Sequence, residues 1–452
     1  MAKKDAQYEK MINTPIPKLV TSLAVPTMIS MLITSVYNLA DTYFVSKLGT
    51  YASGAVGIVF SLMAMIQAIG FTVGMGAGST ISRLLGKKED DIAQKTASSA
   101  LLVSIISGGF FSVFGIFFLE KLVVWMGATE SILPYATEYA RYILYVAPVM
   151  TVSFVLNNLL RAEGKTKLSM IGILCGSILN IGLDPLFIFV FQWGITGAAA
   201  ATAISQIVSC LILFFFFFRK KTILRLSVKH LSADISLYRE FLGNGLPSLF
   251  RQGLASVSSI ALNHVAAGYS DAAVAAMSIV GKIFLMVYCV LIGFGQGYQP
   301  AAGYNYGAKE YKRVRQAYRF LMIAGTAAMS GIGVLLFFIA PFLMRQFIAD
   351  DTEVIEIGVS ALRMQCVVMP FLTLGIACNM TFQAVGQSLK ATALASMRQG
   401  IFFLPFIWIL PRVFGILGME AAQPAADAAT FLVCIPVIWK FIKEIRNEEE
   451  KT

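Results

Sequence analysis

Long runs of apolar residues follow one another along this chain from end to end. Residues 96–119 and 320–344 each hold more than twenty consecutive positions without a charge. A helix needs about 20 apolar residues, at a rise of about 1.5 Å each, to cross the hydrocarbon core of a bilayer. A signal peptide would be a single short run, and a porin-type barrel would show segments of alternating polarity. The pattern therefore predicts an all-α membrane protein.

The runs number twelve, and the composition agrees with them. Of the 452 residues, 57% are hydrophobic and 13% are charged. A soluble domain carries roughly twice that fraction of charge. The expected transmembrane helices cover residues 17–43, 53–78, 96–119, 131–160, 168–191, 194–218, 238–268, 272–302, 317–344, 354–386, 389–411 and 416–440.

The basic residues predict how these helices are oriented. Of the 36 lysines and arginines, 27 lie at the termini or in the loops on the same side as the termini, and four lie in the opposite loops. Cytoplasmic loops of membrane proteins carry such an excess, so we expect both termini in the cytoplasm. The net charge of +11 then reflects topology, and it requires no nucleic-acid partner.

The six cysteines all lie within apolar runs, without metal-ligand spacing, and only two histidines are present. We interpret the cysteines as small buried hydrophobes and expect no cofactor.

The two halves of the chain repeat each other. The tripeptide that ends at Pro26 corresponds to the one that ends at Pro247, and other short motifs recur at nearly the same interval. Six spans are an even number, so the halves have the same orientation and are related by an axis along the membrane normal. We predict two parallel six-helix lobes, residues 1–218 and 238–452, joined by a basic linker, residues 219–237. Such duplication is typical of transporters, and a duplicated non-transporter is the alternative.

Within the spans of the N-terminal half lie the acids Asp41, in the first, and Asp184, in the fifth. Ionisable groups at such positions are costly and usually functional. Two carboxylates that share a low-dielectric site do not both ionise readily, so the pair predicts a site that holds a proton, or a Na⁺ ion bound by Asp41, Asn180, Asp184 and Thr202. The alternative is a hydrogen-bonded network that only joins helices. Tyr37 and Asn38 share the helix face of Asp41 and complete the expected cation-coupling set.

The C-terminal half has the opposite polarity. Arg251, Lys282 and Arg398 lie near the middle of the seventh, eighth and eleventh spans, and Asp427 is the acid near them. We assign these four residues, with Tyr139 of the fourth span, to a substrate cavity. For Lys282 and Arg398 a structural tie to backbone carbonyls is the alternative.

Pro26 lies in the same span as Asp41. A proline frees a backbone carbonyl and permits a kink, so this residue is a candidate hinge through which protonation bends the helix. A static kink is the alternative, because membrane helices tolerate proline well.

Four segments resemble the signatures of the multidrug and toxic compound extrusion (MATE) family of transporters. They are Val36–Gly49, Gly70–Gly86, Arg161–Gly164 and Asn180–Pro185, and the resemblance extends along nearly the whole chain. Asp41, Asn180, Asp184 and Thr202 match the bacterial branch of this family that keeps its coupling acids in the N-terminal lobe. The sequence departs from the other bacterial branch, which has acids in its seventh and tenth spans.

The resemblance implies two six-helix lobes that form a V around a central cavity, in a multi-pass protein of the cytoplasmic membrane of a bacterium or archaeon. It also implies an antiporter, not an enzyme, that exports small amphipathic drug-like compounds in exchange for H⁺ or Na⁺, and we expect a monomer. A flippase for lipids or lipid-linked oligosaccharides is the alternative, because a basic cavity suits a pyrophosphate. A membrane-embedded transferase would need a catalytic cluster at the interface, and the short external loops offer none.

Overall fold

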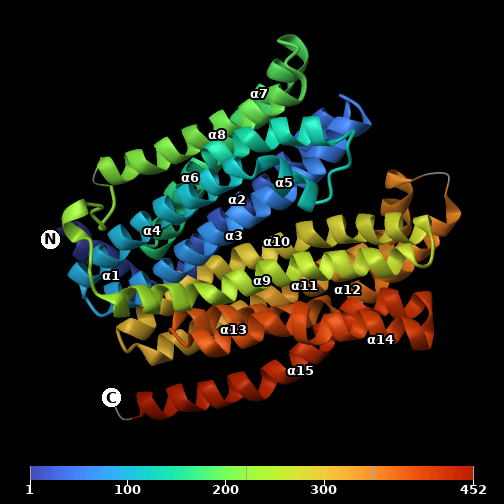
Figure 1. Ribbon diagram of the computed structural model, residues 1–452. Helices are drawn as coiled ribbons and strands as arrows, with labels where there is room; N and C mark the ends of the chain where they lie inside the picture. The colour runs from blue at the N-terminus through green and yellow to red at the C-terminus, as the bar shows by residue number, and fades with distance from the viewer. Residues whose placement is uncertain (1, 220, 349–350, 451–452) are drawn as a thin grey trace.

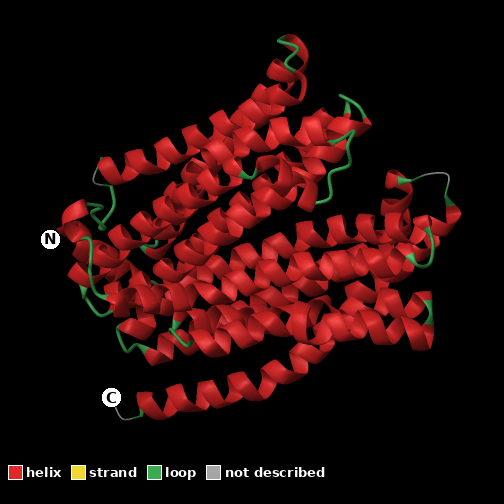
Figure 2. Cartoon of the chain, in the orientation of Figure 1, coloured by secondary structure: helices red, strands yellow, loops and turns green. Residues whose placement is uncertain are grey.

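The computed structural model describes residues 2–219, 221–348 and 351–450, and every regular element in this part of the chain is helical (Figure 2). The long helices of the first half are α2 (Ile16–Ser46), α3 (Thr50–Gly86), α4 (Asp90–Phe117), α6 (Leu133–Ala162), α7 (Thr166–Pro185) with the π-helical turn η1 (Leu186–Val190), and α8 (Gly194–Phe218). Those of the second half are α9 (Ile235–Ala267), α10 (Asp271–Gly307), α11 (Tyr311–Phe347), α12 (Thr352–Ala384), α13 (Ser388–Ser396) continued by the π-helical η3 (Met397–Phe403) and α14 (Leu404–Phe414), and α15 (Ile416–Glu449). Three short elements accompany them: α1 (Ala2–Asn13), α5 (Leu119–Trp125) and η2 (Val228–His230).

Within the described residues, 11 helices are long and apolar enough to cross a membrane, with α7 and η1 counted as one helix and α13 to α14 as another. Helix α9 supplies the twelfth span expected from the sequence, with 33 residues. It falls short on apolarity because it carries polar residues such as Asn244, Ser248 and Arg251 on positions that are buried or half-buried. The all-α membrane architecture is confirmed, with α9 as its least apolar span.

The helices form two lobes, α2 to α8 and α9 to α15, which lie side by side and separate toward one end (Figure 1). Helix α1, residues 221–234 and the end of α15 all lie at the other end, which we call the terminal face; the opposite end is the distal face (Figure 1). Across the boundary, α2 packs on α10 and α3 packs on α9. The predicted pair of repeated lobes is confirmed.

Glycines set how closely the lobes approach each other. A Cβ atom added to Gly86 of α3 would collide with the carbonyl oxygen of Tyr304 in α10. A Cβ added to Gly307 of α10 would collide in the same way with the carbonyl oxygen of Arg83 in α3. The interval along the sequence from Gly86 to Gly307 equals that from Arg83 to Tyr304, and it is the interval of the internal repeat. The two contacts are therefore one contact repeated by the internal two-fold axis.

A second glycine contact obeys the same symmetry. A Cβ on Gly76 of α3 would lie 2.7 Å from the backbone nitrogen of Gly245 in α9, and a Cβ on Gly297 of α10 would lie against Ala24 of α2. The repeat interval also relates Gly76 to Gly297 and Ala24 to Gly245. Small residues let helix backbones approach closely within a membrane. We call these contacts, all in the half of the molecule nearer the terminal face, the glycine seam.

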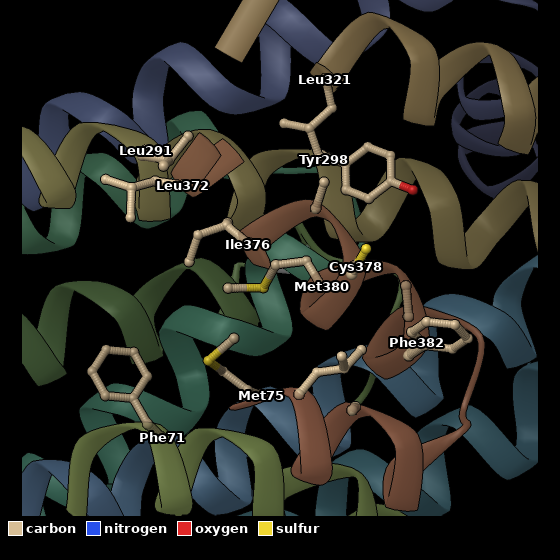
Figure 3. Packing of buried hydrophobic residues seen from close by; sticks show 14 of the residues in the cluster. Phe71, Met75, Leu291, Tyr298, Leu321, Leu372, Ile376, Cys378, Met380 and Phe382 are labelled. Carbon is tan, nitrogen blue, oxygen red and sulfur yellow. The ribbon is translucent and has the colours of Figure 1, made fainter. Parts of the chain in front are cut away.

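The core around the seam takes side chains from both lobes. Met75 of α3 lies among C-terminal-lobe residues that include Met380 and Phe382 (Figure 3). Phe382 and Tyr298 are fully buried, and the Tyr298 hydroxyl lies 2.9 Å from Thr381 Oγ1. The lobes therefore share one continuous apolar core at this level.

Polar contacts also tie the lobes together along the seam. Arg83 Nη2 lies 2.8 Å from Glu240 Oε1 of α9, and Arg83 Nη1 donates to the carbonyl oxygen of Ala384 at 3.1 Å. Arg161 of α6 donates to Gln296 of α10. These pairs add specificity to the packing of the seam.

The segment that connects the lobes is anchored by one buried carboxylate. Glu163, at the end of α6, accepts hydrogen bonds from the backbone nitrogens of Ile223 and Leu224 at 2.9 and 2.8 Å, and from Lys165 Nζ at 2.6 Å. Burial raises the pKa of the Glu163 carboxyl, and Lys165 and the two backbone donors act in the opposite direction. The backbone carbonyl of Glu163 also accepts from Gln7 of α1 at 2.7 Å.

Glu163→Ala leaves the buried N–H groups of Ile223 and Leu224 without acceptors, which costs about 1–3 kcal/mol for each group. We expect a lower midpoint of thermal unfolding in detergent, measured by intrinsic fluorescence. Glu130→Ala, at an exposed loop position, is the matched control and should leave the midpoint unchanged. Equal midpoints for the two variants would contradict the anchoring role of Glu163.

Candidate functional site

Side chains from four helices of the N-terminal lobe meet around Asp41. The Tyr139 hydroxyl of α6 donates to Asp41 Oδ2 at 3.4 Å and lies 3.5 Å from Thr202 Oγ1 of α8. Asn180 Nδ2 of α7 donates to Asp184 Oδ1 and to Thr202 Oγ1, both at 3.3 Å. The hydrogen bonds thus link the two acids through Tyr139, Thr202 and Asn180.

The two carboxyl groups belong to one buried cluster. Asp41 is 8% exposed and Asp184 is fully buried. Two ionised carboxylates in one low-dielectric site repel each other, and a proton or a cation bound there would remove this repulsion.

Several oxygens of this site have no hydrogen-bond donor. Asp41 Oδ1, Asn180 Oδ1, Asp184 Oδ2 and Ser205 Oγ are buried and unpartnered. Buried polar atoms are nearly always satisfied, so such a group calls for an explanation, such as a proton, an ion or a water. Carboxylate, amide and hydroxyl oxygens are also the ligands that hard cations prefer. We call Asp41, Asp184, Asn180, Thr202, Tyr139 and Ser205 the carboxylate site.

A cavity of about 90 Å³ lies beside the carboxylate site within the N-terminal lobe. It is large enough for several waters, since one water needs roughly 10–15 Å³ by the same measure. Tyr37 and Asn38 line it, together with Asn180, Thr202 and Ser205. The cavity offers water a place beside the carboxylates.

The structure thus brings together the six residues expected for cation coupling. It places Tyr139 with them, whereas the sequence had led us to expect this residue in the substrate cavity. Ser205 was missed, although it lies three residues after Thr202 and therefore on the same face of α8.

The backbone changes its helix type directly after Asp184. Pro185 has no N–H group to continue the α-helical hydrogen bonds, and the π-helical η1 follows it. Single π-helical turns are frequent at functional sites. In the other lobe the fifth helix also changes to π-helix, at η3, which contains Arg398.

In the C-terminal lobe, Arg398 and Asp427 form a buried ion pair. Arg398 Nε lies 2.6 Å from Asp427 Oδ1, which also accepts from Gln423 Nε2 at 2.9 Å. Asp427 Oδ2 accepts from Gln365 Nε2 at 2.7 Å. Both carboxylate oxygens are therefore occupied by donors.

Arg251 lies near this pair but has neutral partners. Its Nη1 donates to Asn379 Oδ1 at 3.1 Å, and its Nη2 lies 3.6 Å from Met75 Sδ, across the lobe boundary. Lys282 of α10 is exposed, and no ion pair joins it to another described residue. Of the C-terminal-lobe residues assigned to the substrate cavity, Asp427 thus neutralises Arg398, while Arg251 and Lys282 have no carboxylate partner among the described residues.

Pro26 lies inside α2, which continues on both sides of it, in the half nearer the terminal face. The Ser30 hydroxyl donates to the Pro26 carbonyl oxygen at 2.8 Å. Three residues earlier, the backbone carbonyl oxygen of Leu23 accepts a hydrogen bond from the Thr27 hydroxyl at 2.9 Å. Side-chain hydroxyls therefore bond to the backbone carbonyls of Leu23 and Pro26, as in helices that bend.

Two parallel six-helix lobes, meeting at one end and each bearing buried charges, define the class of secondary transporters with duplicated helix bundles. The MatE family model matches residues 26–186 and 247–409, one segment in each lobe, and the chain belongs to this family of multidrug transporters.

Similar proteins agree with this assignment. The multidrug export protein MepA of Staphylococcus saprophyticus is 25% identical over 437 residues, which cover 96% of each chain. A solved structure of a multidrug resistance MATE family transporter in an outward-facing conformation is 26% identical, with a TM-score of 0.92, and covers 97% of this chain and 98% of its own. A transporter of the MOP superfamily from Pyrococcus furiosus has the same identity, TM-score and coverage. The chain is therefore a multi-pass membrane transporter for multidrug efflux, whose substrates are small molecules.

Asp427→Asn leaves the buried Arg398 without a counter-charge, which costs about 3–5 kcal/mol. We expect a large drop in the midpoint of thermal unfolding in detergent. The double variant Arg398→Gln with Asp427→Asn removes both charges and should recover part of that loss. A double variant destabilised by the sum of the two single effects would contradict the ion pair.

Proposed function

We propose that this transporter is an antiporter, in which the carboxylate site takes up H⁺ or Na⁺ and drives the export of small amphipathic organic compounds. The observation that carries the proposal is the hydrogen-bonded network that joins Asp41 and Asp184, together with the buried, unpartnered oxygens around them. Such a site changes its interactions sharply when a cation arrives, which is what coupling requires.

The terminal face is the cytoplasmic one in this proposal, because the basic residues concentrate there. The protein then lies in the cytoplasmic membrane with both termini inside. The glycine seam closes the cytoplasmic side, and the lobes separate toward the outside (Figure 1). The described conformation corresponds to an outward-open state, in which the cavity beside Asp41 takes its ion from outside. We propose that the transporter works as a monomer, since each chain carries both lobes.

Helix α2 connects the ion to the rest of the cycle. It carries Asp41 near its distal end and Pro26 near the seam, and it packs on α10 of the other lobe. Neutralisation of the carboxylates removes their repulsion and permits α2 to bend at Pro26. This change displaces substrate from the wall between the lobes and prepares the return to the inward-open state.

A second function, flipping of lipids or lipid-linked oligosaccharides, is favoured by one observation. Arg251 and Lys282 have no carboxylate partners among the described residues, and a phosphate group would supply one. The two functions differ in whether the cargo is a free solute or a lipid.

Asp41→Asn holds the site permanently neutral while keeping the shape of the side chain. We expect it to abolish gradient-driven dye efflux in proteoliposomes, to less than about one tenth of the wild-type rate, with unchanged reconstitution. Asp91→Asn, at an exposed position of the terminal face, is the matched control. Efflux by Asp41→Asn at the wild-type rate would remove the coupling role of Asp41.

Sodium and pH gradients imposed separately identify the coupling ion. Efflux driven by a sodium gradient at equal pH on both sides assigns the site to Na⁺, and efflux driven by a pH gradient without sodium assigns it to H⁺. Each response should disappear in Asp184→Asn. A gradient response that persists in this variant would place the coupling site elsewhere.

A further inference from the structure

One face of α10 and one face of α2 trace the opening between the lobes. On α10 the residues of this face are buried at Gly297 and Gly293, half-buried at Cys289, 37% exposed at Met286 and exposed at Lys282. They follow one another at intervals of three or four residues, so they share a side of the helix. The exposure therefore rises from the seam toward the distal face.

The matching face of α2 behaves in the same way. It runs from Ala24, which is 1% exposed, through Ser35, which is half-buried, to Thr42, which is exposed. The Ser35 hydroxyl donates to Cys289 Sγ at 3.3 Å, the level at which the lobes begin to part. Lys282, two helical turns beyond Cys289, thus faces the opening from the C-terminal lobe.

The basic residues near the middle of the C-terminal-lobe spans outnumber the acid near them. Lys282, Arg251 and Arg398 supply three cations, and Asp427 supplies one carboxylate. Two positive charges remain. Helix α3 on the facing wall contains no acid, and the acid of α2, Asp41, is 8% exposed within the carboxylate site.

Asp427 is poorly placed to receive a cationic substrate. Its two oxygens already accept from Arg398, Gln423 and Gln365. A cation would have to displace a buried partner, and an unpaired charge would be left behind. An anion meets the opposite situation, because Arg398 Nη2 is buried without a hydrogen-bond partner and Arg251 binds only neutral groups.

Aromatic rings lie beside Arg398. Its guanidinium stacks over Tyr288 at 4.5 Å and over Phe284 at 5.3 Å from the ring centroids. Both rings are two positions away from Met286, so they lie on a different side of α10. The donors available at the lobe boundary are therefore Lys282 and Arg251, and a guanidinium can bind a carboxylate through paired donors.

We infer that the substrates of this transporter include amphipathic organic anions, whose carboxylate or sulfonate group is bound by Arg251 and Lys282 at the lobe boundary. This inference rests on the proposed efflux function and names its substrate class. The binding group is an anion on an aromatic body in free solution, not a lipid headgroup.

Two xanthene dyes of similar size and opposite charge test the inference, fluorescein as the anion and rhodamine 123 as the cation. We expect the full-length wild type in proteoliposomes to export fluorescein under an imposed gradient with the lower KM. Lys282→Met should raise the KM for fluorescein by about tenfold, the equivalent of one lost charge pair of about 1.4 kcal/mol. Lys282→Glu should raise it further and lower the KM for rhodamine 123. Lys121→Met, at an exposed position away from the opening, is the matched control.

Binding to the detergent-solubilised protein, followed by fluorescence anisotropy, gives a readout that needs no transport. Equal affinity of wild type and Lys282→Glu for fluorescein would overturn the inference. Coupled export of rhodamine 123 without fluorescein would overturn it while leaving the efflux function intact. Movement of fluorescent phosphatidylglycerol across the bilayer without export of fluorescein would overturn it in favour of a lipid cargo. Binding of fluorescein that depends on Lys282, combined with full coupling in the Asp41 and Asp184 variants, would support the substrate class and contradict the proposed antiport function.

Discussion

The close approach of the two lobes at the glycine seam is the constraint on which the rest of the structure depends. Gly86 and Gly307 bring the backbones of α3 and α10 into contact at symmetry-related positions, and Gly76 and Gly245 do the same for α3 and α9. Any side chain at these positions would push the lobes apart. Because the seam occupies only the half nearer the terminal face, the packing that holds the lobes together there leaves them apart at the distal face.

The two lobes share the same helical architecture, but they differ in the charged residues that they carry. The N-terminal lobe buries two acids that are joined by hydrogen bonds through Tyr139, Thr202 and Asn180, with oxygens that lack donors. In the C-terminal lobe, the mid-membrane acid of this region, Asp427, neutralises Arg398, and Arg251 and Lys282 are left without counter-charges among the described residues. In the proposed mechanism an arriving cation binds in the first lobe, and the second lobe carries the uncompensated positive charge. Helix α2 links the two, since it carries Asp41 and packs against α10.

Most of the architecture could be predicted from the sequence, because apolar length and the internal repeat are properties of the chain itself. The carboxylate site could also be predicted, since Asp41, Asn180, Asp184 and Thr202 carry strong local signals. Tyr139 could not be placed, because its neighbours come from α2 and α8, and no spacing along α6 reveals them. Helix α1 and the hydrogen bonds from Ile223 and Leu224 to the Glu163 carboxylate were not predicted, for a similar reason. Both depend on contacts between segments distant in the sequence.

The π-helical segments mark the limit of sequence reasoning in another way. Pro185 explains why the α-helix ends after Asp184, but no proline explains the start of η3 at Met397. Arg398 reaches Asp427 from within this segment, and the ion pair decides which charges remain for a substrate. The polarity of the opening thus rests on a local change of helix type that has no evident signal in the chain.

The central claim is that the state of the carboxylate site controls the separation of the lobes about the glycine seam. It is tested most directly by the distance between spin labels at position 130, in the loop before α6, and position 412, near the end of α14, measured by double electron–electron resonance in a cysteine-free background. The account predicts two populations of distance whose ratio changes with pH or sodium in the wild type, and a ratio that no longer responds when Asp41 and Asp184 are both replaced by asparagine. An unchanged response in that double variant would contradict it.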